Sequence, residues 1–159
     1  MKKPKSYSFI LCDKHILARQ RRRRYTLNMK KILYIFVFSF LLNFVWENLH
    51  ALLYAGYQGG KITEFILFRA SLGDAVMITV LALPFLFIAW FQKRSWLMIV
   101  IGIVLAILIE WYALGAGRWA YNEYMPIIPF LGTGLTPTIQ LGLLGYLSYW
   151  AAVRREKNI

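Results

Sequence analysis

Long apolar segments, separated by short charged or glycine-rich stretches, constrain the fold of this 159-residue chain more than any other feature. Hydrophobic residues make up 59% of the sequence and charged residues only 16%, which is more apolar surface than a soluble domain of this size can bury. We therefore predict an all-α integral membrane protein, a bundle of four transmembrane helices. The predicted spans are residues 32–54, 67–91, 96–114 and 138–153.

Residues 118–137, between the third and fourth predicted spans, do not fit a continuous helix. Pro126, Pro129 and Pro137 interrupt the segment, which is nevertheless too apolar for a free aqueous loop. We predict an interfacial or re-entrant segment here. Pro84, within the second span, is expected to kink that helix.

Basic residues are concentrated before the first span. Residues 1–28 contain nine basic residues and one acidic residue (+8), whereas residues 29–159 contain ten basic and six acidic residues (+4). A cationic cluster beside an apolar helix favours anionic lipid headgroups over nucleic acid, so the expected partner is the lipid bilayer. We predict a disordered cytoplasmic tail over residues 1–28 and a single transmembrane domain over residues 29–159. Met29 followed by two lysines also resembles a start of its own, so the alternative is an upstream extension without function.

The connecting charges predict the orientation. In a four-span arrangement the basic residues near positions 30, 93 and 154 all fall on one side, whereas the opposite loops carry chiefly Lys61 and Arg118. Positive charge stays on the cytoplasmic side, so we predict a multi-pass protein of the cell (inner) membrane with both termini in the cytoplasm. The only cysteine is Cys12, which excludes an intramolecular disulfide.

Polar residues recur on one face of the first span. Asn43, Glu47, His50 and Tyr54 are spaced i, i+4, i+7 and i+11, which is a single helical face. An ionisable side chain at mid-membrane costs about 2.5–3.5 kcal/mol, so Glu47 needs a partner, a proton or water. At about 1.5 Å per residue, Glu47 and Glu110 lie at about 22 Å and about 21 Å from the cytoplasmic edge of the membrane.

Three further polar side chains, Arg69, Asp74 and Gln140, fall in the same outer half of the predicted bundle. We therefore predict a polar pocket that opens to the extracytoplasmic side, has an aliphatic floor and is covered by residues 118–137. Two negative charges in it are uncompensated, because Glu47, Asp74 and Glu110 face only Arg69. His50, Arg118, a shared proton, a bound cation or a cationic ligand could supply the compensation.

The residue types suggest roles for these side chains. The candidate catalytic residues are Glu47, His50 and Glu110, as general acid or base groups. The candidate ligand-binding residues are Asn43, Tyr54, Arg69, Asp74, Arg118, Trp119 and Gln140. For the amides the alternative is interhelical hydrogen bonding, and for Arg69 with Asp74 it is a structural ion pair at a helix end.

One spacing in the sequence weakly suggests a metal site. Glu47-x-x-His50 has the spacing used by di-iron helix bundles, with Asp74 and Glu110 as further ligands, but the only other histidine is His15 in the tail. We therefore expect no metal and no cofactor, and keep that four-residue set as the alternative. The motifs of zinc proteases, serine hydrolases and P-loop proteins do not occur.

Three functions fit the predicted pocket. The first is the binding of a lipidic or amphipathic ligand, with the carboxylates at its polar end and the aliphatic floor around its tail. The second is a membrane-embedded enzyme, an acid/base isomerase, cyclase or hydrolase that acts on a lipid-like substrate. The third is an accessory subunit whose polar residues fix helix pairing with a membrane partner or in a homo-oligomer.

Overall fold

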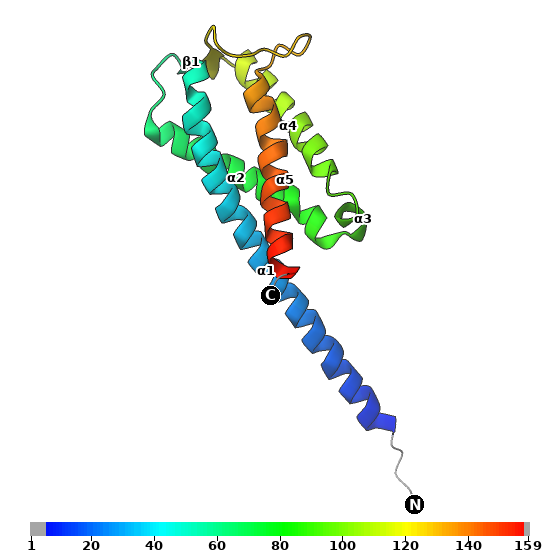
Figure 1. The fold of residues 1–159 in the computed structure, drawn as a ribbon. Helices are drawn as coiled ribbons and strands as arrows, with labels where there is room; N and C mark the ends of the chain where they lie inside the picture. Colours follow the sequence, from blue (N-terminus) through cyan, green and yellow to red (C-terminus); the bar gives the residue numbers. More distant parts are fainter. Residues whose placement is uncertain (1–5, 158–159) are drawn as a thin grey trace, which may run out of the picture.

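The structure is a computed structural model that describes the backbone of residues 6–157 and the side chains of residues 26–155. The helices are α1 (Ser6–His50), α2 (Glu64–Phe87), α3 (Ala89–Gln92), α4 (Leu97–Gly115) and α5 (Leu135–Lys157) (Figure 1). A 3-10 turn, η1 (Ala51–Leu53), leads from α1 into strand β1 (Tyr54–Tyr57), which pairs antiparallel with strand β2 (Trp119–Tyr121).

Three helical segments in the described part of the chain are long and apolar enough to cross a membrane: Thr26–Leu53, Glu64–Phe87 and Leu97–Gly115. Each exposes aliphatic side chains along one side. Leu41, Val80 and Val104, for example, are 55%, 59% and 50% exposed. Exposed apolar stripes of this length are typical of helices that face lipid. The prediction of apolar helices long enough to cross a membrane is therefore confirmed for three segments.

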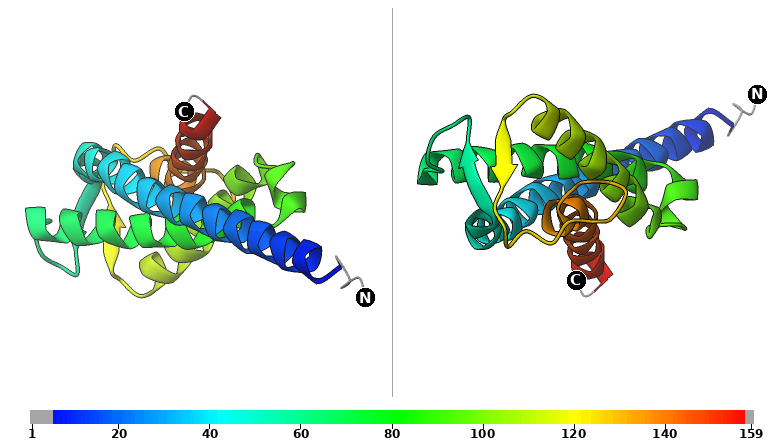
Figure 2. Two further views of the ribbon diagram at one scale, coloured as in Figure 1. Left: turned by 90° about the horizontal axis from the view of Figure 1, so that it is seen from below. Right: turned by 90° about the horizontal axis from the view of Figure 1, so that it is seen from above.

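Helix α5 lies at one side of the molecule (Figure 2) and is in contact with α1, α2 and α4. Along it Leu141, Leu144, Tyr149 and Ala152 are buried. A helix packed on several sides by protein does not need a uniformly apolar surface, which explains why α5 is less apolar than the three segments above.

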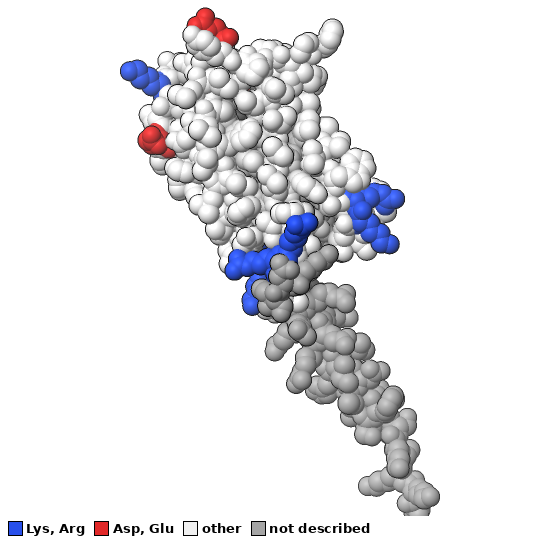
Figure 3. Space-filling view, in the orientation of Figure 1, with Lys and Arg blue, Asp and Glu red and all other residues white. Residues whose placement is uncertain are grey.

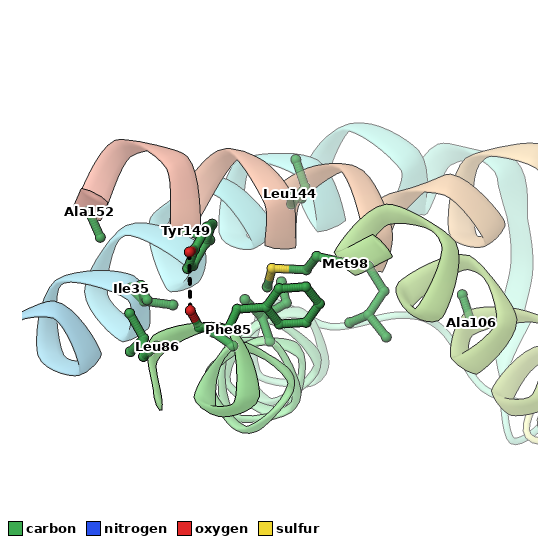
Figure 4. Packing of buried hydrophobic residues seen from close by; sticks show 11 residues of the cluster. Ile35, Phe85, Leu86, Met98, Ala106, Leu144, Tyr149 and Ala152 are labelled. Atoms are coloured by element: carbon green, nitrogen blue, oxygen red, sulfur yellow. Dashed lines mark hydrogen bonds between the residues drawn. The ribbon is translucent and has the colours of Figure 1, made fainter. Parts of the chain in front are cut away.

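The apolar core lies between α1, α2, α4 and α5, in the half of the molecule away from the sheet (Figure 4). Ile35, Ile78, Phe85 and Met98 are fully buried there. The Phe85 ring packs edge-on against the Tyr149 ring, with centroids 5.9 Å apart. These contacts fix the helices relative to one another. The polar residues of the predicted pocket lie in the other half of the molecule, next to the sheet.

The two-stranded sheet corrects the expected all-α fold. The first helix was predicted to continue to residue 54, but α1 ends at His50 and the chain becomes extended at Tyr54. Tyr54 pairs with Tyr121 and Tyr57 pairs with Trp119. Pairing with β2 satisfies backbone groups that a longer α1 would have paired within itself.

The second predicted span is divided at its C-terminal end. Residues 67–91 were expected to form one kinked helix, but Ile88 is extended (φ −108°, ψ 116°) and separates α2 from α3. The break leaves carbonyls without helical donors. The Gln92 side chain donates to the Leu86 carbonyl at 2.8 Å, and the Tyr149 hydroxyl donates to the Phe85 carbonyl at 3.2 Å.

Residues 118–134 form strand β2 and an irregular loop at the sheet end of the helices (Figure 1), and the structure does not confirm the re-entrant segment predicted for residues 118–137. The loop is tied to α4 by the Trp111 indole, which donates to the Leu131 carbonyl at 2.8 Å. Helix α5 begins at Leu135, three residues before the predicted start, because Pro137 lies in the first helical turn, where its missing N–H is not needed.

The first 28 residues were predicted to be a disordered tail. The backbone of α1 begins at Ser6, but the side chains before Thr26 lie outside the described residues. The disorder of this tail and its boundary with the transmembrane domain stay predictions.

A Tyr149→Phe substitution tests the break after α2. The variant keeps the ring packing on Phe85 but leaves that residue's carbonyl without its side-chain donor, so we expect the free energy of unfolding to fall by about 1 kcal/mol. Tyr146→Phe, on the same helix and without a described hydrogen bond, is the matched control. Chemical unfolding of both variants in mild detergent measures the difference, and equal stabilities would contradict this role for Tyr149.

Candidate functional site

A cavity of about 290 Å³ lies between the helices in the half of the molecule next to the β1–β2 sheet. Every predicted site residue lines it except Asn43 and Arg118. The predicted residues in its wall are Glu47, His50, Tyr54, Arg69, Asp74, Glu110, Trp119 and Gln140. The structure therefore brings together side chains from four helices and both strands at a single space.

Gln140 is the polar centre of this cavity. Its Nε2 atom lies 2.9 Å from Asn43 Oδ1, 2.7 Å from Glu47 Oε1 and 2.8 Å from Asp74 Oδ2. The Asn43 amide in turn donates to the Ser39 carbonyl at 2.8 Å. One amide of α5 thus joins α1 to α2, and two carboxyl oxygens so close to a single nitrogen lie within about 6 Å of each other.

Glu47 also faces the one histidine of the site. His50 Nε2 lies 3.9 Å from Glu47 Oε2, and the imidazole is only 7% exposed. Among the described side chains, His50 Nδ1 is one of two buried polar atoms without a hydrogen-bond partner. The Tyr54 ring lies beside the imidazole, with centroids 5.3 Å apart.

Glu110, on α4, has a different environment. It is 4% exposed, and its Oε2 atom accepts hydrogen bonds from the Trp119 indole at 3.3 Å and from the Tyr121 hydroxyl. The Tyr121 oxygen accepts in turn from the Gly134 backbone N–H at 2.9 Å. Strand β2 and Gly134, the residue before α5, therefore both position the Glu110 carboxyl.

The turn after α4 makes this arrangement possible. Gly117 has φ +62°, the left-handed conformation that ends many helices, and the Arg118 N–H returns to the Ala113 carbonyl at 2.8 Å. The chain therefore reverses, and Trp119 comes back over Glu110 one residue later.

The two tyrosines at the sheet end are neutral phenols. Burial raises the pKa of Tyr54 above its ordinary value, and the nearby Glu110 charge raises it further. Burial also raises the pKa of Tyr121, and so does the hydrogen bond that its hydroxyl donates to Glu110. Both hydroxyls thus remain available as hydrogen-bond donors at neutral pH.

The two arginines are not positioned to neutralise the carboxyls. Arg69 lines the cavity but is exposed, and it forms no ion pair with Asp74, although both side chains are among those described. The Arg118 guanidinium is exposed and lies 5.4 Å from the centre of the Tyr112 ring. A ligand-binding role for either arginine stays a prediction.

The rest of the wall is apolar. Ile66, Leu67 and Met77 of α2 line the cavity, as do Ala106 and Ile109 of α4. A cavity with an apolar wall and a few converging polar groups is the usual form of a small-molecule site. The predicted cover over residues 118–137 contributes only Trp119 and Pro137 to the lining.

Sequence reasoning missed Tyr121 as a partner of Glu110. It lies in a run of aromatic residues, Trp119, Tyr121 and Tyr124, that is equally typical of a membrane-interface belt. The distinguishing signal is the pairing of β2 with β1, which aligns Tyr121 with Tyr54 at the cavity.

The alternative metal set was Glu47, His50, Asp74 and Glu110. Among the described residues, no group of three or more His, Cys, Asp or Glu side chains is arranged to hold a metal ion. The structure therefore does not support that alternative.

Comparison with models of protein families, with curated proteins and with solved structures gives no match to this chain.

Proposed function

We propose that this chain is a multi-pass membrane protein that binds a lipidic or amphipathic ligand in the cavity, with an electropositive part of the ligand against Glu47, Asp74 and Glu110. In this proposal α5 is the fourth span, both termini are cytoplasmic, and the cavity opens toward the extracytoplasmic side. The observation that carries it is the convergence of three carboxyls, with no arginine or lysine paired to them among the described side chains, on one apolar-walled cavity.

The distribution of exposed charge supports this orientation. Figure 3 shows most of the visible lysines and arginines at the end of the molecule away from the sheet, a wide band of uncharged surface beyond them, and one basic side chain with two acidic patches toward the sheet end. The exposed basic residues from three separate parts of the chain at that end are Lys30, Lys93, Arg94, Arg154 and Arg155. An uncharged band next to a basic end is typical of a membrane protein whose basic end is cytoplasmic.

Aromatic residues accompany the same arginines. The guanidinium of Arg94 lies 4.5 Å from the Trp90 ring centre, and that of Arg154 lies 4.0 Å from the Trp150 ring centre. Trp and Arg pairs of this kind are common at the membrane–water interface, because each side chain has an apolar part and a polar part. They support an interface at this level of the molecule.

The cavity favours a ligand with an electropositive group over an anionic one. Three carboxyls from three helices line it, and they would repel a carboxylate or phosphate head in so apolar a space. A ligand that carries positive charge, or develops it, would compensate the cluster. The apolar wall formed by Leu67, Met77 and Ile109 would then surround its hydrocarbon part.

Filling the cavity tests ligand binding. We expect Met77→Trp to weaken the binding of dodecylamine at least about tenfold, or about 1.4 kcal/mol, because the indole occupies space that the hydrocarbon chain needs. Val80→Trp adds the same side chain to the lipid-facing side of α2, where Val80 is 59% exposed, and should leave the affinity unchanged. Native mass spectrometry of the detergent-solubilised protein measures the bound amine.

The head-group preference is tested in the same titration. Dodecanoate has the same chain length as dodecylamine but the opposite charge, and we expect it to bind much more weakly. Equal binding of both probes, or equal effects of the two tryptophan substitutions, would contradict a cavity site organised by carboxyls.

A further inference from the structure

The Gln140 amide cannot satisfy all of its acceptors. Its nitrogen carries two hydrogens, but three oxygens, those of Asn43, Glu47 and Asp74, lie within 2.9 Å of it. Glu47 Oε1 and Asp74 Oδ2 lie 2.7 Å and 2.8 Å from this one nitrogen, so the two carboxyls are close to each other. Two ionised carboxylates so close together repel strongly, whereas one proton between them converts the repulsion into a hydrogen bond. A proton shared by Glu47 and Asp74 would remove this repulsion, and the proposal below places one there.

Glu110 differs from this pair because two donors, the Trp119 indole and the Tyr121 hydroxyl, converge on one of its oxygens. These two donors fix the orientation of the Glu110 carboxyl in the cavity wall. The same cavity thus contains a close pair of carboxyls around the Gln140 amide and a separate carboxyl that accepts two hydrogen bonds. Two carboxyl sites kept in different protonation states are the usual arrangement for acid and base catalysis.

His50 is the remaining titratable group of the cavity. It is 7% exposed, it lies 3.9 Å from Glu47, and its Nδ1 atom has no hydrogen-bond partner in the described part of the chain. A buried polar atom without a partner costs free energy, so its retention in a cavity wall points to a ligand or a proton as its partner. This observation is independent of the acidic cluster.

We propose that the cavity catalyses a proton-transfer isomerisation of an unsaturated lipid, a step that rests on the proposed ligand binding. The Glu47–Asp74 pair donates its proton to one carbon of a C=C double bond, and Glu110 removes a proton from the carbon next to the resulting cation. One C–H bond forms, one C–H bond breaks, and the double bond moves along the chain. Substrate and product have the same formula, so no oxidant or second reactant is needed.

The three carboxyls also explain how the cavity tolerates the cation formed between the two transfers. Negative charge fixed around a developing positive charge is most effective beside apolar side chains, and Leu67, Met77 and Ile109 line the same cavity. After each turnover the proton on Glu110 returns to the Glu47–Asp74 pair through solvent. Asn43, Gln140, Trp119 and Tyr121 are positioning residues, because they act through the carboxyls.

Infrared spectroscopy tests the shared proton without a substrate. The wild-type protein at neutral pH should show the C=O stretch of a protonated carboxyl, shifted in D₂O. We expect Glu47→Gln and Asp74→Asn each to abolish the band, and Glu110→Gln to retain it. Absence of the band from the wild-type protein would overturn the proposal, whether or not the variants fold.

Deuterium incorporation tests the reaction. The detergent-solubilised protein is incubated in D₂O with three unsaturated probes: an oleoyl phospholipid, a polyprenyl alcohol and a monounsaturated sterol. We expect carbon-bound deuterium in at least one probe, and a loss of about a hundredfold or more in Glu110→Gln, which retains an oxygen for Trp119 and Tyr121. Glu64→Gln, an exposed acid at the start of α2, should match the wild type.

The two proposals fail in different ways. If dodecylamine binds but none of the three probes gains deuterium, isomerisation is overturned and ligand binding stands. If dodecylamine does not bind either, the proposed function fails as well. If Glu110→Gln incorporates deuterium as fast as the wild type, Glu110 is not the proton acceptor and the proposed mechanism is overturned.

Discussion

A Gly102→Ala substitution in α4 is expected to lower the free energy of unfolding by about 3 kcal/mol. This is the upper end of the range that is typical when a side chain is enlarged in a well-packed core. A Cβ atom on Gly102 would lie 2.7 Å from the backbone nitrogen of Gly142 and 3.0 Å from the Leu141 carbonyl carbon. Both atoms belong to the backbone of α5 and cannot rotate away. The constraint is mutual, because a Cβ atom on Gly142 would lie 2.5 Å from the Ile99 carbonyl oxygen.

Gly115→Ala is the matched control for this prediction. It makes the same substitution in the same helix, but apart from its chain neighbours and the nearby helix backbone, no described atom lies within 4 Å of the added carbon. Alanine favours helix over glycine by up to about 1 kcal/mol, so this variant should be as stable as the wild type or slightly more stable. Chemical unfolding in mild detergent compares them. If Gly102→Ala is no less stable than Gly115→Ala, α4 and α5 do not approach each other at Gly102 and Gly142.

The location of the polar cavity could be predicted because helical geometry converts sequence position into depth. Glu47 precedes the end of α1 by less than one turn, and Asp74 and Gln140 follow the starts of α2 and α5, so antiparallel packing brings them to one level. The cost of isolated polar groups among apolar helices then favours their association. The observed ends of α1, α2 and α5 differ from the predicted ones by several residues, but these differences are too small to separate the polar groups.

The partners of each polar group were harder to predict. Charge accounting suggested Arg69 as a partner of Asp74, but residues five apart point to different sides of a helix. The structure leaves Arg69 at the exposed rim and gives Asp74 an uncharged donor, Gln140. Depth can be calculated from a single helix, whereas rotation about the helix axis depends on how all the helices pack.

The small sheet could not be predicted from local pattern. Strands β1 and β2 have four and three residues, too few to show alternation, and they are separated by two long helices. Their pairing depends on where α1 and α4 end relative to each other. The Tyr121 contact with Glu110 follows from that pairing, so it was missed for the same reason.

Replacing Gln140 with leucine should be the most damaging single change in the cavity. The variant removes the shared donor of Asn43 Oδ1, Glu47 Oε1 and Asp74 Oδ2 and leaves these acceptors among packed helices. Each buried acceptor without a donor costs about 1–3 kcal/mol. The expected loss is about 3–5 kcal/mol, a large share of a typical total stability of about 5–15 kcal/mol. Asn48→Leu removes an exposed amide from α1 and should change stability by about 0.5 kcal/mol or less.

A combined variant separates the structural role of this network from its function. Changing Asn43, Glu47, Asp74 and Gln140 together to leucine removes every unsatisfied group that the single change creates, and apolar replacement of a whole buried polar network is often neutral or stabilising. We expect it to recover most of the stability lost in Gln140→Leu but not the binding of dodecylamine. Chemical unfolding and native mass spectrometry measure the two properties. If the combined variant recovers both stability and dodecylamine binding, the ligand does not need the carboxyls. If Gln140→Leu is as stable as Asn48→Leu, the Gln140 amide does not stabilise the Asn43, Glu47 and Asp74 side chains.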